Sequence, residues 1–359
     1  MHIAMIGAGY VGLVTWACLA QIGHCVVCHD SDSRKINELN AGRIPIFEPG
    51  LTDLVAANIN ADRLRFTDNL ADAVQGASAA FIAVGTPSRP GDGHADLRQV
   101  YAAIRALAPL LRSGMVIVTK STVPVGTGDE IARIISQINP RVAVHIAANP
   151  EFLREGAAIH DFMNPDRIVI GVEDEEAARC LDMIYRPIIA RGVPLVRSGR
   201  RTAEMIKYAA NTFLAMKITF INEMADLAER IGADIQDVAH AIGLDARIGQ
   251  QFLRAGPGIG GSCFPKDTRG LLKTAHDYDV PLRIVESVML VNDARKRAMA
   301  RKVSAAFGGD LRGKVIAVLG LTFKPETDDV RESPAMPLVV AVQDMGAKVR
   351  GYDPVGMDQ

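Results

Sequence analysis

The sequence has almost no excess of charge of either sign, because 40 basic residues stand against 41 acidic ones and give a formal net charge of -1. A chain so balanced has no overall field that would attract nucleic acid or an anionic membrane, so an anionic ligand must be held by local groups. It also has no apolar run that is long and uncharged enough to cross a bilayer. Residues 1–7 have no basic region of the kind that begins a signal peptide.

Cysteine is scarce, and the five cysteines are odd in number and scattered along the chain. This pattern favours a reducing compartment over a disulfide framework. Cys25 and Cys28, flanked by His24 and His29, have the spacing of a metal or redox motif. On a strand, however, positions three apart point to opposite faces, so the two thiols do not converge on one ion. We therefore expect a cytoplasmic protein with no metal site.

The length of 359 residues exceeds one ordinary core and predicts two or three domains. Over residues 1–198, short β-branched runs alternate with helical patterns. This alternation predicts an α/β domain of the Rossmann type, with a doubly wound parallel sheet covered by helices on both faces. The expected strands cover residues 2–6, 25–29, 79–84, 115–119, 142–147 and 167–171. The expected helices cover residues 13–22, 33–41, 97–111 and 128–138.

Residues 199–300 have a purely helical pattern, which predicts a second, all-helical domain. Residues 202–231 contain no internal glycine or proline and would form a helix about 45 Å long; a helix of this length often forms the spine of a dimer. Further helices are expected at residues 235–242, 267–278 and 281–307. Residues 301–359 predict strands at 314–320 and 348–352 around a helix at 334–345. One β-α-β unit is an incomplete α/β domain, because a doubly wound domain normally has five or six strands.

A Gly-x-Gly-x-x-Gly motif, formed by Gly7, Gly9 and Gly12, follows the first expected strand and begins the first helix. In such a motif the first glycine permits a tight turn, the second lets a pyrophosphate approach the backbone, and the third lets helix and strand pack closely. The helix N-terminus then faces the phosphates. Asp30 ends the second expected strand, where a carboxylate accepts hydrogen bonds from an adenosine ribose. No arginine occupies the next two positions, Ser31 and Asp32, to bind a 2′-phosphate, so the motif predicts NAD as the cofactor.

Residues 256–261 include four glycines, which predict that a ligand approaches the backbone closely. Cys263 follows just before an expected helix, and Pro265 suits the first turn of that helix. A thiol at a helix N-terminus beside Lys266 has a lowered pKa and is nucleophilic, and Asp267 lies one turn farther on. An alternative of equal weight, from this segment alone, is a buried loop cysteine beside a capping acid.

Lys207 and Asn211 lie four residues apart on the long expected helix and share one face. Aimed into a cleft, they would stabilise an alkoxide or oxyanion, although a solvated helix face is the commoner reason for such a pair. Residues 120–126 and 149–156 each follow an expected strand of the first domain. Because ligands bind at the carboxyl edge of an α/β sheet, this placement favours a functional interpretation of both segments.

Together these segments resemble the UDP-glucose/GDP-mannose dehydrogenase family, and the resemblance covers essentially the whole chain in order. The segments are GAGYVG at residues 7–12, STVPVGT at 121–127, NPEFLREG at 149–156, EMIKYAAN at 204–211, FLRAGPGIGGSCFPKD at 252–267 and GLTFKPETDDVRES at 320–333. The GGSCFPKD form resembles the UDP-glucose branch more than the UDP-N-acetyl-hexosamine branches. The resemblance implies a four-electron oxidation of the C6 alcohol of UDP-glucose, which yields UDP-glucuronate for polysaccharide biosynthesis and uses two NAD in succession.

The resemblance also implies roles for individual residues. Cys263 would be the nucleophile that holds the aldehyde as a thiohemiacetal and then carries a thioester, which water cleaves. Lys207 and Asn211 would stabilise the oxyanion, and Asp267 would assist proton transfer or orient water. The residues that would hold the catalytic water beside the nicotinamide are Thr122 and Glu155.

The implied binding residues form two sets. Cofactor contacts are implied at Gly7, Gly9, Val11, Gly12, Asp30, Lys35, Thr86, Thr122, Glu155, Lys266 and Arg331. Substrate contacts are implied at Glu151, Phe152, Leu153, Arg154, Glu155, Lys207, Asn211, Arg247, Phe252, Leu253, Arg254, Ala255, Gly256, Gly260 and Lys324. In this family the arginine at the position of Arg247 can reach the substrate of a neighbouring subunit, which accords with a homodimer formed through the central helix.

Three alternatives remain open from the sequence. The substrate could be GDP-mannose or another UDP-hexose, or the chain could be an NAD-binding remnant with little activity. A simple 3-hydroxyacid or 6-phosphogluconate dehydrogenase shares the Rossmann-plus-helix layout but would not need the Cys263 loop. Family members also continue beyond the single β-α-β unit at the end of this sequence, so we expect the chain to bind NAD through its first domain and to hold a UDP-sugar weakly.

Overall fold

A computed structural model describes residues 1–89 and 93–358 of the chain. By the density of contacts between residues, the chain divides into two compact units, residues 1–207 and 208–359. Each unit is described by itself below. Within the described residues, no helix is both long enough and apolar enough to span a membrane.

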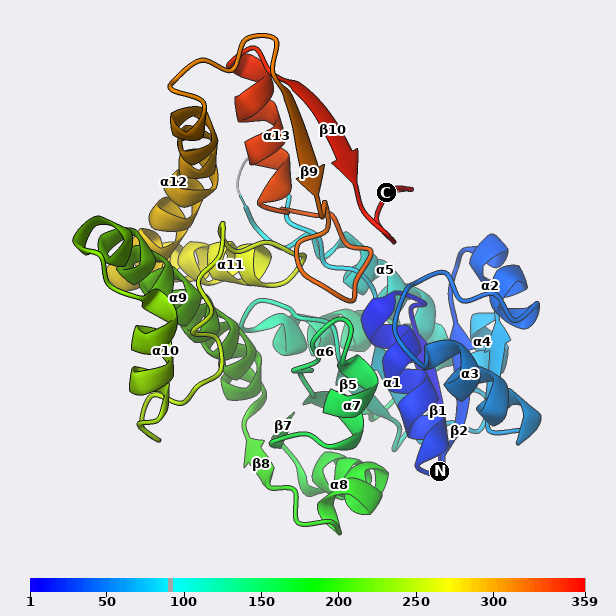
Figure 1. Cartoon of the computed structure of the whole chain (residues 1–359). Helices are drawn as coiled ribbons and strands as arrows, with labels where there is room; N and C mark the ends of the chain where they lie inside the picture. Colours follow the sequence, from blue (N-terminus) through cyan, green and yellow to red (C-terminus); the bar gives the residue numbers. More distant parts are fainter. Residues whose placement is uncertain (90–92, 359) are drawn as a thin grey trace. The chain divides into compact units, whose positions relative to one another are not determined.

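Unit 1 is built on one eight-stranded sheet (Figure 1). In sheet order its strands are β3 (Leu64–Thr67), β2 (Cys25–His29), β1 (His2–Ile6), β4 (Ala79–Ile82), β5 (Val116–Thr119), β6 (His145–Ala148), β7 (Ile168–Val172) and β8 (Leu195–Ser198). The strand order reverses between β1 and β4, so the sheet is doubly wound, and the predicted α/β fold class is confirmed. The sequence did not predict β3 and β8, which have only four residues each and expose part of their length.

One pairing departs from the predicted parallel sheet, because β6 and β7 run antiparallel. The connection between them is mostly irregular and contains one short helix, α7 (Ala158–Met163). Six helical residues span only about 9 Å, whereas a five-residue strand spans about 16 Å. The connection therefore lacks the long crossover helix that usually joins parallel strands, and β7 returns in the opposite direction.

Helices cover both faces of this sheet and create two separate cores, as predicted (Figure 1). Along β1, Ile3 and Met5 enter one core while Ala4 and Ile6 enter the other, as the two-residue period of a strand requires. The first core also takes side chains from α1 (Tyr10–Gln21), α2 (Ser33–Asn40), α3 (Leu51–Asn60), α7 and α8 (Glu175–Ile189). The second takes side chains from α4 (Leu70–Val74), α5 (Arg98–Leu107), the 3-10 helix η1 (Ala108–Leu110) and α6 (Thr127–Ile138).

Helix α9 (Arg200–Ile231) begins in unit 1 and continues into unit 2. Its 32 residues contain neither glycine nor proline and span about 48 Å, which confirms the long helix expected from the sequence. The other helices of unit 2 are α10 (Ile235–Gly243), α11 (Phe264–Asp277), α12 (Arg283–Ala306) and α13 (Ala335–Asp344).

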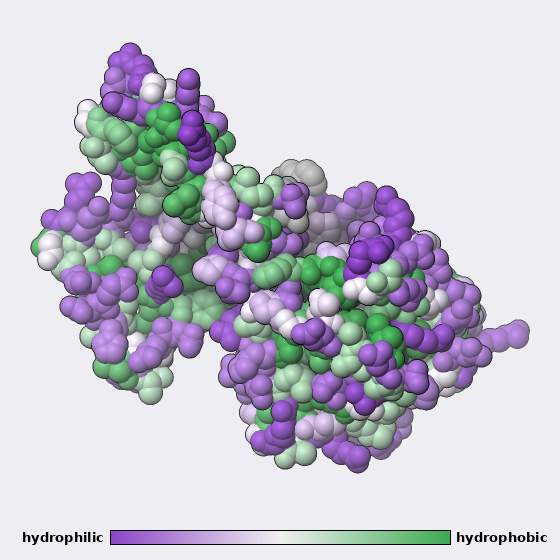
Figure 2. All heavy atoms as spheres, turned by 45° about the vertical axis from the view of Figure 1, so that its right-hand side comes forward, coloured by the Kyte–Doolittle hydropathy of each residue, from purple (hydrophilic) through white to green (hydrophobic). Residues whose placement is uncertain are grey.

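Unit 2 also contains a two-stranded parallel sheet, β9 (Val315–Leu319) and β10 (Lys348–Tyr352), which α13 connects. This is the β-α-β unit that the sequence predicts. Within the described residues, β9 and β10 pair only with each other. Several large apolar side chains remain exposed here, and Figure 2 shows apolar surface over these elements. The exposed residues are Val315, Leu319, Val340 and Tyr352.

The first turn of α9 is fixed to unit 1 by a buried carboxylate. Glu204 is 4% exposed, and its two oxygens accept the backbone N–H groups of Gly126 and Gly128 at 2.6 and 2.9 Å. Gly126 is the N-cap of α6 and has no side chain of its own for capping. Glu204 therefore satisfies two helix-terminal donors from another element, at the positive end of α6.

We predict that Glu204→Ala lowers the free energy of unfolding by about 1–3 kcal/mol, because two buried N–H groups lose their acceptor. Urea denaturation followed by circular dichroism measures this change. Glu223→Ala is the matched control, since Glu223 is an exposed glutamate on the same helix and should change stability by less than about 0.5 kcal/mol. Equal effects of the two substitutions would contradict the capping role.

Candidate active site

The turn between β1 and α1 has the geometry that a dinucleotide pyrophosphate requires. Gly7 has φ of +112°, and a Cβ there would lie 2.6 Å from the carbonyl oxygen of Ala83. A Cβ at Gly12 would lie 2.2 Å from the oxygen of Gly7. By contrast, a Cβ at Gly9 would meet nothing within 4 Å, so the backbone there borders open space at the N-terminus of α1. Two glycines thus permit the close packing and the third leaves room for phosphates.

The acidic residue at the end of β2 lies beside this turn. Asp30 accepts the backbone N–H of Ala8 at 2.6 Å and lies 3.7 Å from the ammonium group of Lys35 on α2. The carboxylate is therefore held at the edge of the sheet where β1 and β2 end, next to the predicted phosphate site. Thr86, which follows β4, donates a hydrogen bond to the carbonyl oxygen of Thr122 after β5. These predicted cofactor contacts share the carboxyl edge of the sheet.

A buried ion pair lies at the same edge. Lys207 and Glu151 are 3% and 5% exposed, and the ammonium nitrogen lies 2.9 Å from a carboxylate oxygen. A solvated helix face is thereby excluded for Lys207. Burial by itself would raise the pKa of Glu151, but the charge and hydrogen bond of Lys207, the Leu153 N–H and the charge of Lys120 together lower it. The carboxylate therefore stays ionised although it is buried.

The residues on either side of Pro150 and Glu151 also make close contacts, through the ring of Phe152 and the side-chain amide of Asn149. The guanidinium of Arg167 lies 3.9 Å from the centroid of the Phe152 ring, and the ammonium of Lys207 lies 5.4 Å from the same centroid. Both contacts are cation–π interactions, which favour a cation over the ring face. Asn149, which follows β6, donates to the carbonyl oxygen of Val169 and is 1% exposed. The segment after β6 is thus held tightly by buried polar contacts.

Sequence reasoning missed a second buried carboxylate, Glu48. It is 6% exposed and accepts hydrogen bonds from the hydroxyl of Tyr10 and from the backbone N–H groups of Gly156 at 2.6 Å and Ala158 at 2.7 Å. Glu48 therefore ties the first turn of α1 to the segment that carries Glu155. In the sequence, Glu48 is marked only by the Pro49 and Gly50 that follow it, and this pattern indicates no more than an ordinary turn.

In unit 2, Cys263 is the N-cap residue of α11, and Pro265 lies in the first turn, as predicted. The thiol is partly exposed and lies 3.6 Å from the hydroxyl of Ser262. The backbone of Cys263 accepts the first hydrogen bond of the helix, from the N–H of Asp267. A sulfur at this position faces the positive end of the helix dipole, which favours the thiolate form.

Asp267 is fully buried and is bound from two sides. One oxygen accepts a hydrogen bond from the side-chain amide of Asn211 at 2.6 Å, and the other lies 2.7 Å from the ammonium of Lys266. Asn211 is 5% exposed, so it too is no part of a solvated helix face. The structure thus brings three predicted residues together one helical turn from Cys263.

Close packing explains most of the glycines in the Cys263 loop. A Cβ at Gly260 would lie 2.6 Å from the oxygen of Glu332 and 2.9 Å from Phe323, and one at Gly261 would lie 2.8 Å from the same ring. A Cβ at Gly258 would lie 2.8 Å from Lys296. Of the four glycines, only Gly256 has free space around it. Packing therefore requires glycine at three of the four positions: Gly260 and Gly261 pack against residues 323–332, and Gly258 packs against Lys296.

The remaining predicted residues lie in less constrained surroundings. Arg154, Arg247 and Arg331 each form an ion pair with a nearby aspartate, at 2.6–2.7 Å. Phe252 has φ of +65°, and its ring centroid lies 6.0 Å from that of Phe264. Lys324 lies over the ring of Phe323. Of the others, Leu253 is buried, Val11 and Ala255 are half-buried, and Arg254 is exposed.

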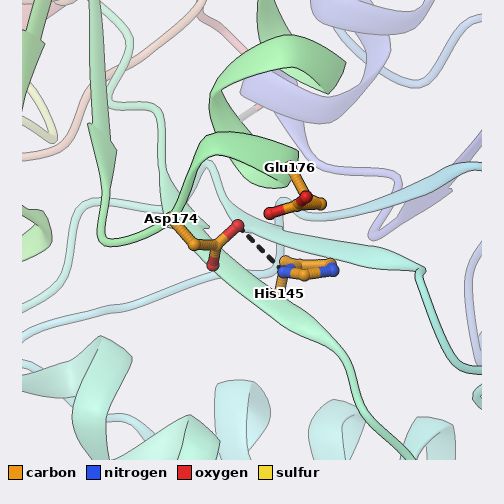
Figure 3. A group of neighbouring side chains, drawn as sticks. All are labelled: His145, Asp174 and Glu176. Carbon is orange, nitrogen blue, oxygen red and sulfur yellow. Dashed lines mark ion pairs between the residues drawn. The ribbon is translucent and has the colours of Figure 1, made fainter.

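One group among the described residues has the composition of a metal site. His145, Asp174 and Glu176 each offer a ligand atom, and these atoms lie within 4.8 Å of one another (Figure 3). Asp174 already caps α8 by accepting the N–H of Ala177, and it pairs with the ring nitrogen of His145 at 2.9 Å. Helix capping and this ion pair account for the group. It also lies at the amino end of β6, at the opposite edge of the sheet from Asn149.

Comparison with known proteins identifies the family of this chain. Three models of the UDP-glucose/GDP-mannose dehydrogenase family match the chain: the NAD binding domain at residues 1–189, the central domain at 201–294 and the UDP binding domain at 317–359. The chain belongs to this family. NAD is therefore the cofactor of its first domain, and the turn at Gly9 with Asp30 fits that cofactor.

Individual members of the UDP-glucose/GDP-mannose dehydrogenase family are close in sequence and structure. A UDP-glucose 6-dehydrogenase of Rhizobium meliloti is 63% identical over 100% of this chain and 82% of its own length. The UDP-glucose 6-dehydrogenase TuaD of Bacillus subtilis is 46% identical over 99% of this chain and 77% of its own. A solved UDP-glucose dehydrogenase from Pyrobaculum islandicum has a TM-score of 0.95 at 42% identity, over 99% of this chain and 82% of that one.

A solved GDP-mannose dehydrogenase from Pseudomonas aeruginosa is 34% identical, with a TM-score of 0.66, over 99% of this chain and 81% of that one. The fold is thus shared across substrate classes of the family. The predictions of family, fold class and cofactor are confirmed. The roles predicted for individual residues stay predictions.

We predict that the protein prefers NAD over NADP, because the Asp30 carboxylate would repel a 2′-phosphate. Replacing it in Asp30→Ala should lower the ratio of kcat/KM for NAD to kcat/KM for NADP by about tenfold or more, as loss of a hydrogen bond to a charged group implies. Steady-state kinetics with both cofactors measures this ratio. Asp53→Ala, at an exposed acid of α3, is the control. An equal or higher kcat/KM with NADP in the unmodified protein would refute the role of Asp30.

Proposed function

We propose that this protein oxidises UDP-glucose to UDP-glucuronate in two successive NAD-dependent steps, through a covalent adduct on Cys263. The observation that carries the proposal is the place of this thiol at the N-terminus of α11, one turn from the buried Asp267–Asn211 pair. Support for UDP-glucose comes from the relatives named above, which carry that name at 63% and 46% identity over nearly the whole chain.

GDP-mannose is the alternative substrate, and the same comparisons favour it less. The solved GDP-mannose dehydrogenase has a TM-score of 0.66, against 0.95 for the UDP-glucose dehydrogenase. The family model matched at residues 317–359 describes a UDP binding domain. A simple one-step dehydrogenase is also disfavoured, because one hydride transfer needs no nucleophilic cysteine.

The covalent route explains why a thiol is needed. NAD supplies the hydride acceptor in both oxidations. After the C6 alcohol has lost a hydride and a proton, the Cys263 thiolate adds to the aldehyde carbon and forms a thiohemiacetal. Loss of a second hydride from that carbon, together with the proton of its hydroxyl, gives a thioester. Water then adds to the thioester carbon and cleaves the carbon–sulfur bond, which releases the carboxylate and a proton and regenerates the thiol. The adduct keeps the aldehyde from escaping between the two oxidations.

Charged and polar side chains would support these steps. Negative charge develops on the sugar oxygen at the thiohemiacetal and again during thioester hydrolysis, and a buried ammonium or amide donor lowers its energy. We assign this role to Lys207 and Asn211. Asp267, which Asn211 and Lys266 hold in place, would orient the hydrolytic water or take up its proton.

Other predicted residues complete the proposal. Thr122 and Glu155 would hold water beside the nicotinamide, and Glu48 supports this role by fixing the segment that carries Glu155. The arrangement of three domains, with boundaries near residues 198 and 300, is likewise a proposal. The product would supply polysaccharide synthesis. A cytoplasmic location would agree with five cysteines that form no disulfide, because disulfides are rare in a reducing compartment.

We also propose that the protein forms a homodimer through α9. Phe213, Phe220 and Leu227 lie seven residues apart, which places them on one face of the helix, and they are 56%, 47% and 52% exposed. Such a stripe of large apolar side chains on a soluble protein marks an association surface. The position of Arg247 in the family pattern, where it can reach a neighbouring subunit's substrate, agrees with this assembly.

We predict that the unmodified protein yields two NADH for each UDP-glucose and that Cys263→Ser stalls after the first oxidation. Release of the acid product should fall by about 1,000-fold or more, because the nucleophile is lost. NADH absorbance and chromatography of the sugar products measure both effects. Mass spectrometry of the unmodified enzyme, quenched during turnover, should show a substrate-sized adduct on Cys263.

Cys25→Ser is the matched control, since Cys25 is another free and partly exposed cysteine, on β2. It should leave the NADH yield at two. A Cys263→Ser protein that releases the acid at the normal rate would end the covalent mechanism. A yield of one NADH would instead indicate a simple alcohol dehydrogenase.

We predict that Phe220→Glu converts the dimer into monomers, because it places a charge in the centre of the apolar face. Sedimentation velocity on the unmodified and substituted proteins measures the change. Phe307→Glu serves as the control, because Phe307 is similarly exposed, at 45%, but lies after α12. A monomeric unmodified protein would refute the proposed dimer.

A further inference from the structure

A second lysine, Lys120, is buried beside the Glu151–Lys207 ion pair and has no role in the mechanism above. It follows β5 and is 4% exposed. Its ammonium nitrogen donates to the side-chain oxygen of Asn149 at 3.0 Å and lies 3.5 Å from the hydroxyl oxygen of Tyr185. All of these residues belong to unit 1. A lysine is rarely buried this completely unless its charge is used or paired.

The polar groups around Lys120 come from the segment after β6, from α8 and from α9. Glu151 follows β6, Lys207 lies on α9 and Tyr185 lies on α8, and the charges of Glu151 and Lys207 act on Lys120 in opposite directions. The hydroxyl of Tyr185 stays neutral, because burial raises its pKa. Asn149 is uncharged and accepts hydrogen bonds from both Lys120 and Tyr185. One carboxylate therefore faces two ammonium groups, and the cluster carries one net positive charge.

This net charge changes how strongly the ammonium of Lys207 attracts an oxyanion. An isolated ion pair between Lys207 and Glu151 would be neutral overall, so its attraction for a developing oxyanion would be weak. A second cation that shares the carboxylate restores a positive potential at the ammonium of Lys207. Preorganised charge of this kind, already in place before the reaction, is an effective means of stabilising a transition state.

We propose that Lys120 is a positioning residue that draws on the Glu151 carboxylate and so strengthens the positive potential with which Lys207 stabilises the oxyanion of the sugar. The inference rests on the proposed function, because it needs an oxyanion beside Lys207. The competing interpretation is structural: Lys120 would only hold Asn149 and the segment after β6.

Protonation of Lys120 separates the two interpretations. Burial lowers the pKa of Lys120 to about 8, against the raising effect of Glu151. The cluster is then positive below pH 8 and neutral above it, once Lys120 has lost its proton. The kcat of the unmodified enzyme should therefore fall as the pH rises through about 8.

The test compares Lys120→Met with Lys120→Arg, using UDP-glucose, NAD and full pH profiles of kcat. Lys120→Met removes the charge and should lower kcat by about tenfold or more, with little change in the KM for either substrate, and it should abolish the fall near pH 8. Lys120→Arg keeps a charge that does not titrate in this range. It should restore kcat to within a few-fold and move the fall to higher pH. Tyr185→Phe removes a neighbouring hydroxyl but no charge, so the fall should stay near pH 8.

Several outcomes would overturn the inference. Normal kcat in Lys120→Met would do so, as would an equal loss in both lysine variants with the fall still near pH 8, which is the structural result. If Lys120→Met does not fold, as judged by circular dichroism and NAD binding, the pH profile of Lys120→Arg decides alone. Failure of the proposed function looks different, because the unmodified enzyme would then produce no NADH from UDP-glucose.

Discussion

The buried ion pair between Lys207 and Glu151 is the interaction on which the arrangement of unit 1 depends. Both charges have left water, and neither could be buried without the other at acceptable cost. The pair joins α9 to the segment after β6, one turn beyond the point where Glu204 caps α6. Two carboxylate contacts thus fix the start of the long helix. Asn211 lies one turn beyond Lys207 along the same helix.

The same constraint organises the carboxyl edge of the sheet. Because β5 and β6 are parallel neighbours, the residues that follow them meet at one edge, and this brings Lys120 against Asn149. Glu48 adds a second tie, from the first turn of α1 to the segment after β6. Hydrogen bonds to buried groups therefore connect the first turn of α1, the segment after β6 and the buried Lys120. Such groups are costly to leave unpaired, which makes the edge rigid.

Unit 2 places an accessible thiol at a helix terminus, one turn from a buried carboxylate. Cys263 stays partly exposed at the end of α11, where the unpaired N–H groups favour a thiolate. One turn on, Asp267 is fully buried and is held by Asn211 from α9 and by its neighbour Lys266. A reactive sulfur that remains accessible and a carboxylate that cannot move are complementary requirements for nucleophilic attack followed by hydrolysis.

The sequence by itself determined the fold class, the cofactor and the long helix, because each depends on local patterns: strand–helix alternation, the spacing of Gly7, Gly9 and Gly12, and the absence of helix breakers in residues 202–231. It also located Cys263, whose helix-terminal position is a local property. Only the tertiary structure decided the antiparallel β7, the short strands β3 and β8, and the packing role of Gly260. Glu48 and Lys120 were equally hidden from the sequence. A buried charge is recognised by its partners, and those partners lie about 30 to 110 residues away along the chain, where no sequence period can indicate them.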